Sequence, residues 1–490
     1  MFGCNELSLR INGRVKIIDK ISINNCKFKQ ISINNHIDGN IEFQKCEFND
    51  FNLYGFSNAT IKGTFTFDFC EIKEKVNFMN FEFENKVSFK MSKFKDNVYF
   101  NNSHFKDYAD FHECEFEKTA SFYGVRFEKT PNFSQAIFRG NLNAVNANLN
   151  FTFDDLQERI KQEYEDFNKN IENKKSLDKF ANDFRDSFRT FKNALIKDNN
   201  LLDASNFHKY ELYCKEIELK QNWDKRGENV KNTTDLEKNV SRIRDFMDFL
   251  LLGFYRKLCD HHTDFLKVFN NLILLIALYA LFVFGFTWLH DDKLEDTRAI
   301  LTLFGFFDKF RLYFDIISTI FVVFGCGFFV CKLDSYEKKN NVSKKQNINF
   351  IYIIGDFLNL IKSLLFASFI PCVFYVLFSL FGFFLNLGKD FGYSLLINTL
   401  FVSLYICLVY TKSLFFGRYV VLIFSYIVFI IMLIKQPNVI HPLIGKIANE
   451  SDKFFNYPSL IVLNILYTIL LALVLFSLQK TARKNSIVPS

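Results

Sequence analysis

Residues 87–97, VSFKMSKFKDN, form one unit of an eleven-residue repeat in the first third of the chain. In this unit Val87 and Phe89 are two residues apart, and so are Ser92 and Phe94. Residues at this spacing point to the same face of an extended chain, so each half of the unit directs a large ring and a smaller partner inward. Steps of five and six residues would scatter these side chains around a helix, which excludes an amphipathic helix here.

The large residues recur on both sides of this unit, at steps that alternate between five and six residues. Fourteen successive positions from 67 to 138 follow the pattern, and thirteen of them are Phe, with Ile72 as the exception. Phe accounts for only 65 of 490 residues, so chance does not explain the run. The predicted core of the repeat is Phe67, Phe78, Phe83, Phe89, Phe94, Phe100, Phe105, Phe111, Phe116, Phe122, Phe127, Phe133 and Phe138.

The residue two before each of these positions is usually small. Phe65 and Phe81 are the bulky exceptions. Upstream of residue 54 the pattern continues with plain steps of five or ten, and residues 142–149 form a degenerate final copy. Terminal copies of a repeat are usually atypical in this way.

A large central residue with a small residue two before it resembles the pentapeptide-repeat family, whose unit is A(D/N)LXX. The resemblance implies a right-handed, quadrilateral β-helix with a Phe ladder inside, and we assign residues 1–152 to this solenoid. Some members of the family imitate DNA with a strongly acidic surface. Residues 67–142 carry 12 Asp and Glu against 11 Lys and Arg, which disfavours DNA mimicry and suits an ordinary solvated face or a protein-binding face.

Composition excludes several further classes of protein. Hydrophobic residues make up 49% of the chain and the mean hydropathy is +0.04, which excludes intrinsic disorder. The net charge of +7 is too small to indicate nucleic acid as a partner. The 11 cysteines include no CxxC pair, which points to a reducing compartment. We interpret those at small inner positions as core packing: Cys26, Cys46, Cys70 and Cys114.

A helical connector is predicted over residues 153–265, because apolar residues there recur at steps of three and four. Three amphipathic helices are expected near 156–171, 180–195 and 202–217, with the third packed back on the second. The stretch FRTFKNALIKDNNLLDASNFHKYELYCKEIEL resembles the helical hairpin that follows the repeats in membrane-bound pentapeptide proteins. Residues 243–258 combine apolar bulk with Arg and Lys, so we expect them to lie on a membrane surface.

A group of Cys, His and Asp follows this last helix at Cys259, Asp260, His261, His262 and Asp264. Adjacent histidines point to different sides of a helix, and the sequence offers no second ligand cluster. We therefore expect no metal site and no cofactor.

Residues 266–490 are predicted to form a multi-span α-helical membrane bundle, because a crossing helix needs about 20 mostly apolar residues. Asp356 and Lys362 interrupt the first third of an apolar run at 350–387, which we interpret as interfacial. The number of spans is five or six, and the six candidates are Val268–Leu289, Leu312–Cys331, Ser363–Leu387, Phe391–Thr411, Tyr419–Ile434 and Ser459–Leu478.

Loop charges predict the orientation of these spans. Residues 332–348 carry five Lys against Asp334 and Glu337, whereas residues 291–298 carry four acidic and two basic residues. Basic loops stay in the cytosol, and the amino terminus has no signal-peptide run, so both termini are expected there. The order of solenoid, hairpin and bundle resembles multi-pass pentapeptide-repeat proteins of bacterial inner membranes.

Three classes of function are compatible with this architecture. The first is a non-enzymatic scaffold, held in the lipid bilayer, that binds an unidentified cytosolic or membrane protein. Association of the chain with copies of itself is an open alternative. A channel or transporter gated by the cytosolic domain is the alternative, although no TVGYG-like filter occurs and the span centres lack ionisable residues. An enzyme is disfavoured, because GxSxG, HExxH and Walker A motifs are absent and we name no catalytic residue.

Overall fold

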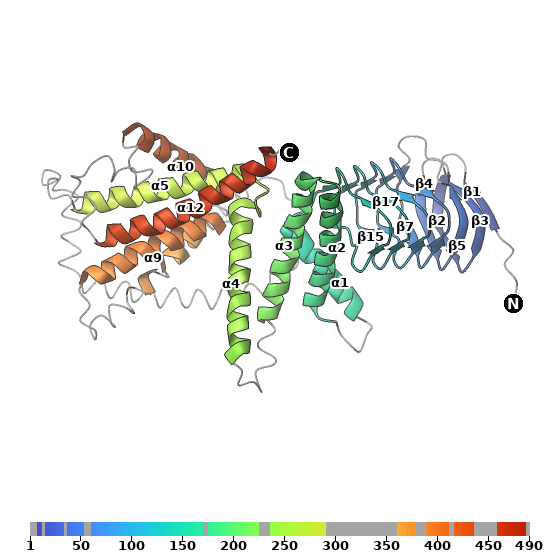
Figure 1. Cartoon of the computed structure of the whole chain (residues 1–490), viewed down its shortest axis with the longest axis horizontal. Helices are drawn as coiled ribbons and strands as arrows, with labels where there is room; N and C mark the ends of the chain where they lie inside the picture. The colour runs from blue at the N-terminus through green and yellow to red at the C-terminus, as the bar shows by residue number, and fades with distance from the viewer. Residues whose placement is uncertain are drawn as a thin grey trace. The chain divides into compact units, whose positions relative to one another are not determined.

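The computed structural model of the chain (Figure 1) divides into two compact units, Met1–Arg256 with Lys484–Ser490, and Lys257–Arg483. The residues that it describes are 7–11, 15–33, 37–52, 60–169, 175–224, 236–290, 360–369, 371–373, 375, 377, 389–410, 416–435 and 458–486.

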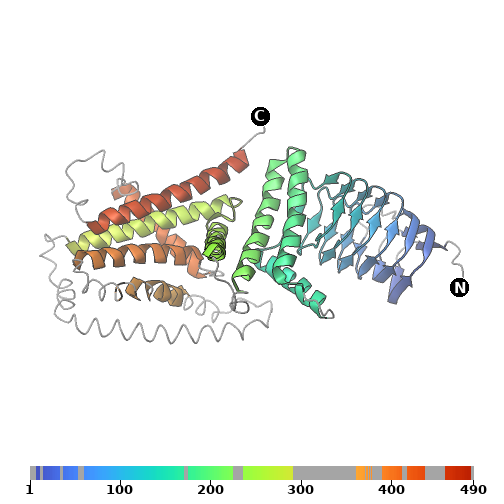
Figure 2. The same cartoon turned by 60° about the horizontal axis from the view of Figure 1, so that its bottom comes forward.

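The first unit begins with a β-solenoid, whose short strands stack along its length (Figures 1 and 2). The described strands are β1 (Leu7–Ile11), β2 (Val15–Asn24), β3 (Lys27–Ile33), β4 (Ile37–Gln44), β5 (Glu47–Asn52), β6 (Thr60–Ile61), β7 (Phe65–Asp68), β8 (Glu71–Ile72), β9 (Val76–Asn77), β10 (Glu82–Phe83), β11 (Val87–Ser88), β12 (Lys93–Phe94), β13 (Val98–Tyr99), β14 (His104–Phe105), β15 (Ala109–Asp110), β16 (Glu115–Phe116), β17 (Ala120–Ser121), β18 (Arg126–Phe127), β19 (Ile137–Phe138), β20 (Leu142–Asn143) and β21 (Asn148–Leu149).

Four parallel ladders run along the solenoid, and from residue 60 onward each pairs a residue with its equivalent two repeat units later, as Val76 pairs with Val98. We call the ladder of β9, β13, β17 and β20 face 1. Around one turn of the chain, face 2 is β6, β10, β14, β18 and β21, and face 3 is β7, β11 and β15. Face 4 is β1, β3, β5, β8, β12, β16 and β19. Faces 2 and 3 share one sheet, because both pair with β4.

The predicted core Phe residues line the inside of these faces in four columns. Rings of successive turns lie parallel, as in Phe78 on Phe100, with centroids 4.9 Å apart, and Phe111 on Phe133, with centroids 4.6 Å apart. Twelve of the thirteen are at most 5% exposed, and Phe138, in the last turn, is half-buried. Each such ring pair adds roughly 0.5–1.5 kcal/mol beyond the burial of its area.

The alternation of five- and six-residue steps reflects two kinds of corner. At five-residue steps, the second residue after the Phe has a positive φ, as at Met91 with 53°. The amide of Ser92 then donates to the Phe89 carbonyl at 3.1 Å, which is the pattern of a type II turn. Gly124 takes the positive-φ position at one corner, where a Cβ would come 2.4 Å from Asn102 Oδ1.

Small polar residues inside the solenoid bond to the backbone of the previous turn. Ser92 Oγ donates to the Phe67 carbonyl at 2.6 Å and accepts from the Cys70 amide at 2.9 Å. Cys114 Sγ donates to the Phe89 carbonyl at 2.8 Å. Burial raises the pKa of the Cys114 thiol, so it stays protonated as this bond requires. The thiol is thus a hydrogen-bond donor to the backbone as well as a packed core group.

Four helices follow: α1 (Phe153–Asn168), α2 (Leu177–Lys197), α3 (Leu201–Asp224) and α4 (Leu236–Cys259). A capping box starts α1, since Thr152 Oγ1 accepts from the Asp155 amide at 3.3 Å and Asp155 Oδ2 accepts from the Thr152 amide at 2.8 Å. Helices α2 and α3 form a hairpin across the end of the solenoid (Figure 1). Phe191 of α2 packs on Phe133, with centroids 4.8 Å apart, and so closes the open end of the Phe columns.

The second unit contains the helices α5 (Phe265–His290), α9 (Lys389–Tyr410), α10 (Phe416–Lys435) and α12 (Pro458–Ser486). Helices α5 and α12 lie side by side (Figures 1 and 2), and the rings of Tyr279 and Tyr467 stack at 3.8 Å. The Tyr279 hydroxyl donates to Asn464 Oδ1 of α12. An amide inside an apolar helix therefore joins two helices here.

Two described helices are long and apolar enough to cross a membrane, over Phe265–Val283 and Ser459–Arg483. They correspond to the first and last predicted spans. Shorter apolar segments occur at Leu360–Val373, Ser394–Tyr410 and Tyr419–Ile434. The predicted span Leu312–Cys331 lies outside the described residues, as do the loop 332–348 and part of the span at 363–387. The part of the chain that the structure describes thus contains a β-solenoid, helices and two candidate membrane spans.

Candidate functional site

The four faces of the solenoid differ in what they present to a partner. Faces 2 and 4 carry charged outward side chains that pair between successive turns. Lys93 lies between Glu115, at 3.1 Å, and Glu117, at 2.8 Å. Exposed pairs of this kind contribute about 0–1 kcal/mol each, and their charges cancel locally. Further pairs on these faces are Lys95–Glu71, Arg139–Glu115, Lys106–Glu82, His104–Glu128 and Arg126–Glu128.

Helix α1 packs beside face 3 through an aromatic and ionic contact. The Arg159 guanidinium lies 3.2 Å from the centroid of the Tyr108 ring, and the Tyr108 hydroxyl donates to Glu163 Oε1 at 2.7 Å. Arg159 also donates to Glu163 along the helix. Tyr108 is 5% exposed, so this contact buries one corner of the solenoid. Face 3 is therefore partly covered within the same unit.

Asp110 is a buried carboxylate on this covered face. Burial, together with the nearby charge of Glu163, raises its pKa to about 6. Its Oδ1 accepts from the His112 amide at 3.0 Å. One turn later Asn132 holds the same place, and its Oδ1 accepts from the Ser134 amide at 2.9 Å. An amide therefore fits this position without a change of backbone bonding.

Asp110→Asn is expected to stabilise the solenoid at neutral pH. Because the folded pKa exceeds the unfolded one, the unfolded state loses its proton first as the pH rises from about 4 to 6, and the free energy of unfolding falls over that window. The amide removes this loss, with a gain of about 1–3 kcal/mol at pH 7 and none at pH 3. Thermal unfolding of the two proteins at both pH values measures it.

Asp96→Asn is the matched control. A hydrogen bond from the Lys118 ammonium lowers the pKa of Asp96, so its charge stabilises the folded state above the unfolded pKa. This variant is expected to lose stability at pH 7. If both substitutions destabilise the protein at pH 7, Asp110 is not held in an unfavourable charged state.

A polar cavity of about 330 Å³ lies between α1 and the neighbouring corner of the solenoid. Its lining includes Asp107, Thr130 and Arg159. Asp107 accepts from Lys129 at 2.5 Å, and the Thr130 hydroxyl has no hydrogen-bond partner among the described residues. Carboxylates outnumber cations in the lining, so the cavity suits water or a small cation better than an anion.

The described residues contain one chain of Ser, His and carboxylate. Ser134 Oγ lies 2.6 Å from His112 Nδ1, and His112 Nε2 lies 3.2 Å from Glu113 Oε1. Ser134 is only 4% exposed, however, and its hydroxyl also contacts Asn132 Oδ1 at 2.5 Å. A nucleophile must reach its substrate, so this geometry does not build an acyl-transfer site.

The Cys–His group after α4 forms a local turn. Cys259 Sγ lies 3.5 Å from His262 Nδ1, and the Thr263 hydroxyl donates to the Asp260 carbonyl at 2.7 Å. Among the residues that the structure describes, no three His, Cys, Asp or Glu side chains are grouped to hold a metal ion.

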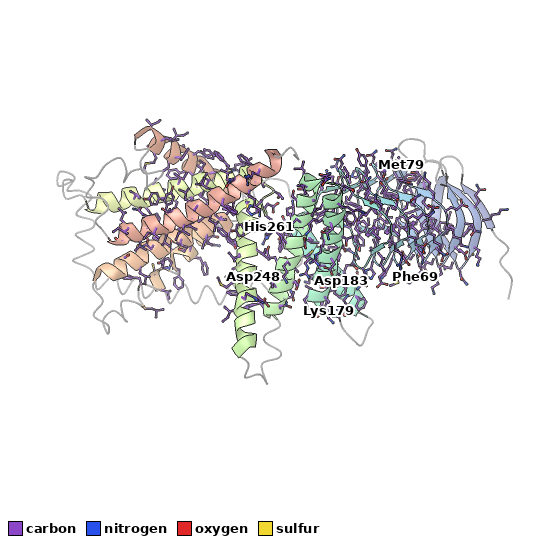
Figure 3. The ribbon with its side chains drawn as sticks, in the orientation of Figure 1. Phe69, Met79, Lys179, Asp183, Asp248 and His261 are labelled. Carbon is purple, nitrogen blue, oxygen red and sulfur yellow. The ribbon has the colours of Figure 1, made fainter. Side chains whose placement is uncertain are left out.

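Face 1 differs from the other three faces because the outward positions of its described strands carry no charged residue. Met79 is 36% exposed and Tyr123 is 39% exposed, and Met79 lies on the side of the solenoid opposite to Phe69 in Figure 3. Tyr and Met are enriched at protein interfaces, whereas Lys and Glu are depleted. The outward positions are Asn77, Met79, Tyr99, Asn101, Ser121, Tyr123, Asn143 and Val145.

Several polar groups of face 1 already form hydrogen bonds within the solenoid. Ser121 Oγ donates to Asn101 Oδ1 at 2.6 Å, and Asn143 Oδ1 accepts from the Val145 amide at 3.1 Å. The Tyr123 hydroxyl accepts from Asn146 Nδ2 at 3.2 Å. These groups keep their hydrogen bonds when a partner covers the face. The cost of removing water from them is therefore small, which favours association. Sequence reasoning missed this face. Successive eleven-residue units belong alternately to faces 1 and 3, so a search at that period mixes the outward residues of the two faces. They separate only at the period of one full turn, which is two units.

The comparison with protein families agrees with the repeat. A family model described as pentapeptide repeats (9 copies) matches residues 67–115, which lie within faces 1 to 4. No curated protein and no solved structure matches the chain. The similarity therefore covers part of the regular solenoid and no other part of the chain.

Proposed function

We propose that the chain is a membrane-anchored, non-enzymatic scaffold, whose solenoid binds a cytosolic or membrane protein through face 1. The observation that carries the proposal is the contrast between faces. Faces 2 and 4 satisfy their charges internally, α1 packs beside face 3, and face 1 presents uncharged Tyr, Met and Asn side chains. The outward positions of the described face 1 strands carry no Lys or Arg, and Lys75 beside them already lies over the Tyr99 ring, which argues for a protein partner over nucleic acid or a lipid headgroup.

Helices α5 and α12 support the anchoring part of the proposal. The apolar segment of α5 has 19 residues, a rise of roughly 28 Å, which matches the hydrocarbon core of a bilayer. Lys267 lies in the first turn of α5, and Lys480 and Arg483 lie in the last two turns of α12. We propose that these helices belong to a bundle of about six spans in a bacterial inner membrane, with both chain termini in the cytosol.

The docking proposal is tested with photo-crosslinking side chains in the full-length protein. A crosslinker at Tyr123 is expected to capture one defined protein, and one at Ile137 is not. Ile137 is 49% exposed on face 4, so it is a matched exposed site away from face 1. Tyr99→Lys is expected to reduce capture from position 123 at least tenfold, because an unpaired cation would be buried at the interface.

The outcomes separate the alternatives. Capture of a second copy of this chain at position 123 would make face 1 a homo-oligomer interface. Equal capture at positions 123 and 137 would contradict a specific docking face. Tyr99→Lys must keep the protease resistance of the unaltered solenoid, so that loss of capture reports the face and not the fold.

A further inference from the structure

We infer that α4 is an interfacial helix, which inserts a stripe of apolar side chains into the lipid surface before α5 enters the bilayer. The inference rests on the proposed membrane anchoring, and it assigns a lipid-binding surface to the unit that carries the solenoid. Its evidence is a second apolar side of α4, and the attachment of the end of α4 to a candidate span.

One side of α4 packs on other helices of the same unit. The Phe246 ring stacks on Trp223 of α3, with centroids 4.2 Å apart. Arg256 donates two hydrogen bonds of 2.8 Å to Glu216, and its guanidinium lies 3.8 Å from the centroid of the Phe153 ring. Phe246 and Arg256 are ten residues apart, about 2.8 turns, so they lie roughly 80° apart on one half of the helix. This side supplies the packing that holds α4 in place.

A second side of α4 is apolar and exposed. Ile243, Met247 and Leu250 are 61%, 50% and 43% exposed, and Leu251 beside them is 47% exposed. Steps of four and three residues place these side chains in one stripe. The exposed Arg244 and Asp248 lie next to the stripe and mark its polar border. Contiguous exposed apolar side chains of this kind mark a contact with another protein or with a membrane.

The attachment of α4 to α5 favours lipid over a second protein. Asn271 Nδ2 of α5 donates to the Leu258 carbonyl in the last turn of α4 at 2.8 Å. Asn271 lies six residues after Phe265, where the apolar span begins, a rise of about 9 Å. The last turn of α4 is therefore held about 9 Å along α5 from the start of the span, a depth that interfacial helices reach.

The turn between the two helices is built to make this attachment. Asp260, His261 and His262 all have positive φ, of 50°, 54° and 66°. The Thr263 amide then bonds to the Cys259 carbonyl at 3.2 Å, and Asp264 Oδ1 accepts from the Lys267 amide at 2.9 Å at the start of α5. Three successive residues in this sparsely populated conformation are unfavourable in free energy. They persist only because the surrounding contacts stabilise this turn. The turn holds the last residues of α4 against α5, so the two helices do not continue as one.

The test places a fluorescent non-canonical amino acid at single positions of the full-length protein in lipid vesicles. Position 247 probes the stripe, position 248 is its polar neighbour, and position 469 on α12, which is 58% exposed, probes the bilayer interior. One set of vesicles carries lipids with a nitroxide near the headgroup, and another set carries it at the chain end. We expect at least threefold stronger quenching at 247 than at 248 by the shallow nitroxide, and strong quenching at 469 by the deep one.

Each outcome decides a separate statement. Quenching at 469 with equal, weak quenching at 247 and 248 would overturn the interfacial helix and leave the membrane anchoring intact. No quenching at 469 would overturn both. A blue-shifted but unquenched label at 247 would show that protein covers the stripe, which also overturns the inference. A label at 243 repeats the measurement in case the label at 247 disturbs the packing of α4.

Discussion

Phe111→Asp is expected to abolish the folded solenoid, and so is Phe100→Asp. Phe111 is fully buried, and its ring contacts Phe89 and Phe133 in its own column, at 5.3 Å and 4.6 Å between centroids. Its neighbours in the column are rings, which offer a carboxylate neither a cation nor a strong hydrogen-bond donor. Burial of an unpaired charge costs several kcal/mol, comparable with the roughly 5–15 kcal/mol that holds a whole domain folded.

The solenoid gives this substitution no way to relax locally. Each turn of a stacked solenoid is supported by its two neighbours alone, so loss of one turn exposes the ends of both. Phe111→Leu is the informative milder change. It retains an apolar side chain but removes two ring stacks, and we expect a loss of about 1–3 kcal/mol with the fold preserved.

Limited proteolysis of the full-length protein in detergent measures the effect. Phe111→Asp should make residues 60–150 as sensitive as an unfolded chain. Lys95→Gln should leave them resistant, because Lys95 faces outward and forms one exposed pair with Glu71. Equal resistance of the Asp and Gln variants would contradict the inward assignment of the Phe residues.

The core of the solenoid was readable from the sequence because its inner positions demand one residue type. A ring inside the column meets a ring above and below, and any smaller residue leaves a cavity. The corners were less readable. Those between faces 1 and 2 carry Asn80, Asn102, Gly124 and Asn146, which favour positive φ, whereas those between faces 3 and 4 use Phe69, Met91, Glu113 and Gln135 in the same conformation.

The candidate site was less predictable than the core for a related reason. The type of residue at an outward position depends on whether another element packs on it. Such packing depends on contacts between distant parts of the sequence, such as Arg159 on Tyr108. The resemblance to membrane-bound pentapeptide proteins predicted a helical hairpin after the repeats. It did not show that Phe191 would close the Phe columns or that α1 would lie beside face 3. Those contacts left face 1 as the uncharged face, and helix α2 meets it at its last strand, β20.

Reporter fusions to the full-length protein are expected to show Ser490 in the cytosol and residues 291–298 on the other side of the membrane. The structure supplies a physical argument for the two described spans. Tyr279 follows Lys267 in α5, and Tyr467 precedes Lys480 in α12 by a nearly equal stretch of helix, yet the two rings stack at 3.8 Å. At a rise of about 1.5 Å per residue, both basic groups lie roughly 18–20 Å from the same contact.

Helices α5 and α12 run antiparallel (Figures 1 and 2), so basic ends at equal distances from one contact lie on the same side of a bilayer. Basic residues remain cytosolic during insertion, so the start of α5 and the end of α12 are expected to face the cytosol together. The total number of crossings must then be even, whichever of the shorter apolar segments cross. A phosphatase that is active only outside the cytosol, fused after Ser490, should be at least tenfold less active than the same enzyme inserted at 291–298. Strong activity of the carboxyl-terminal fusion would require an odd number of crossings, and would contradict the antiparallel pairing of α5 and α12 across one membrane.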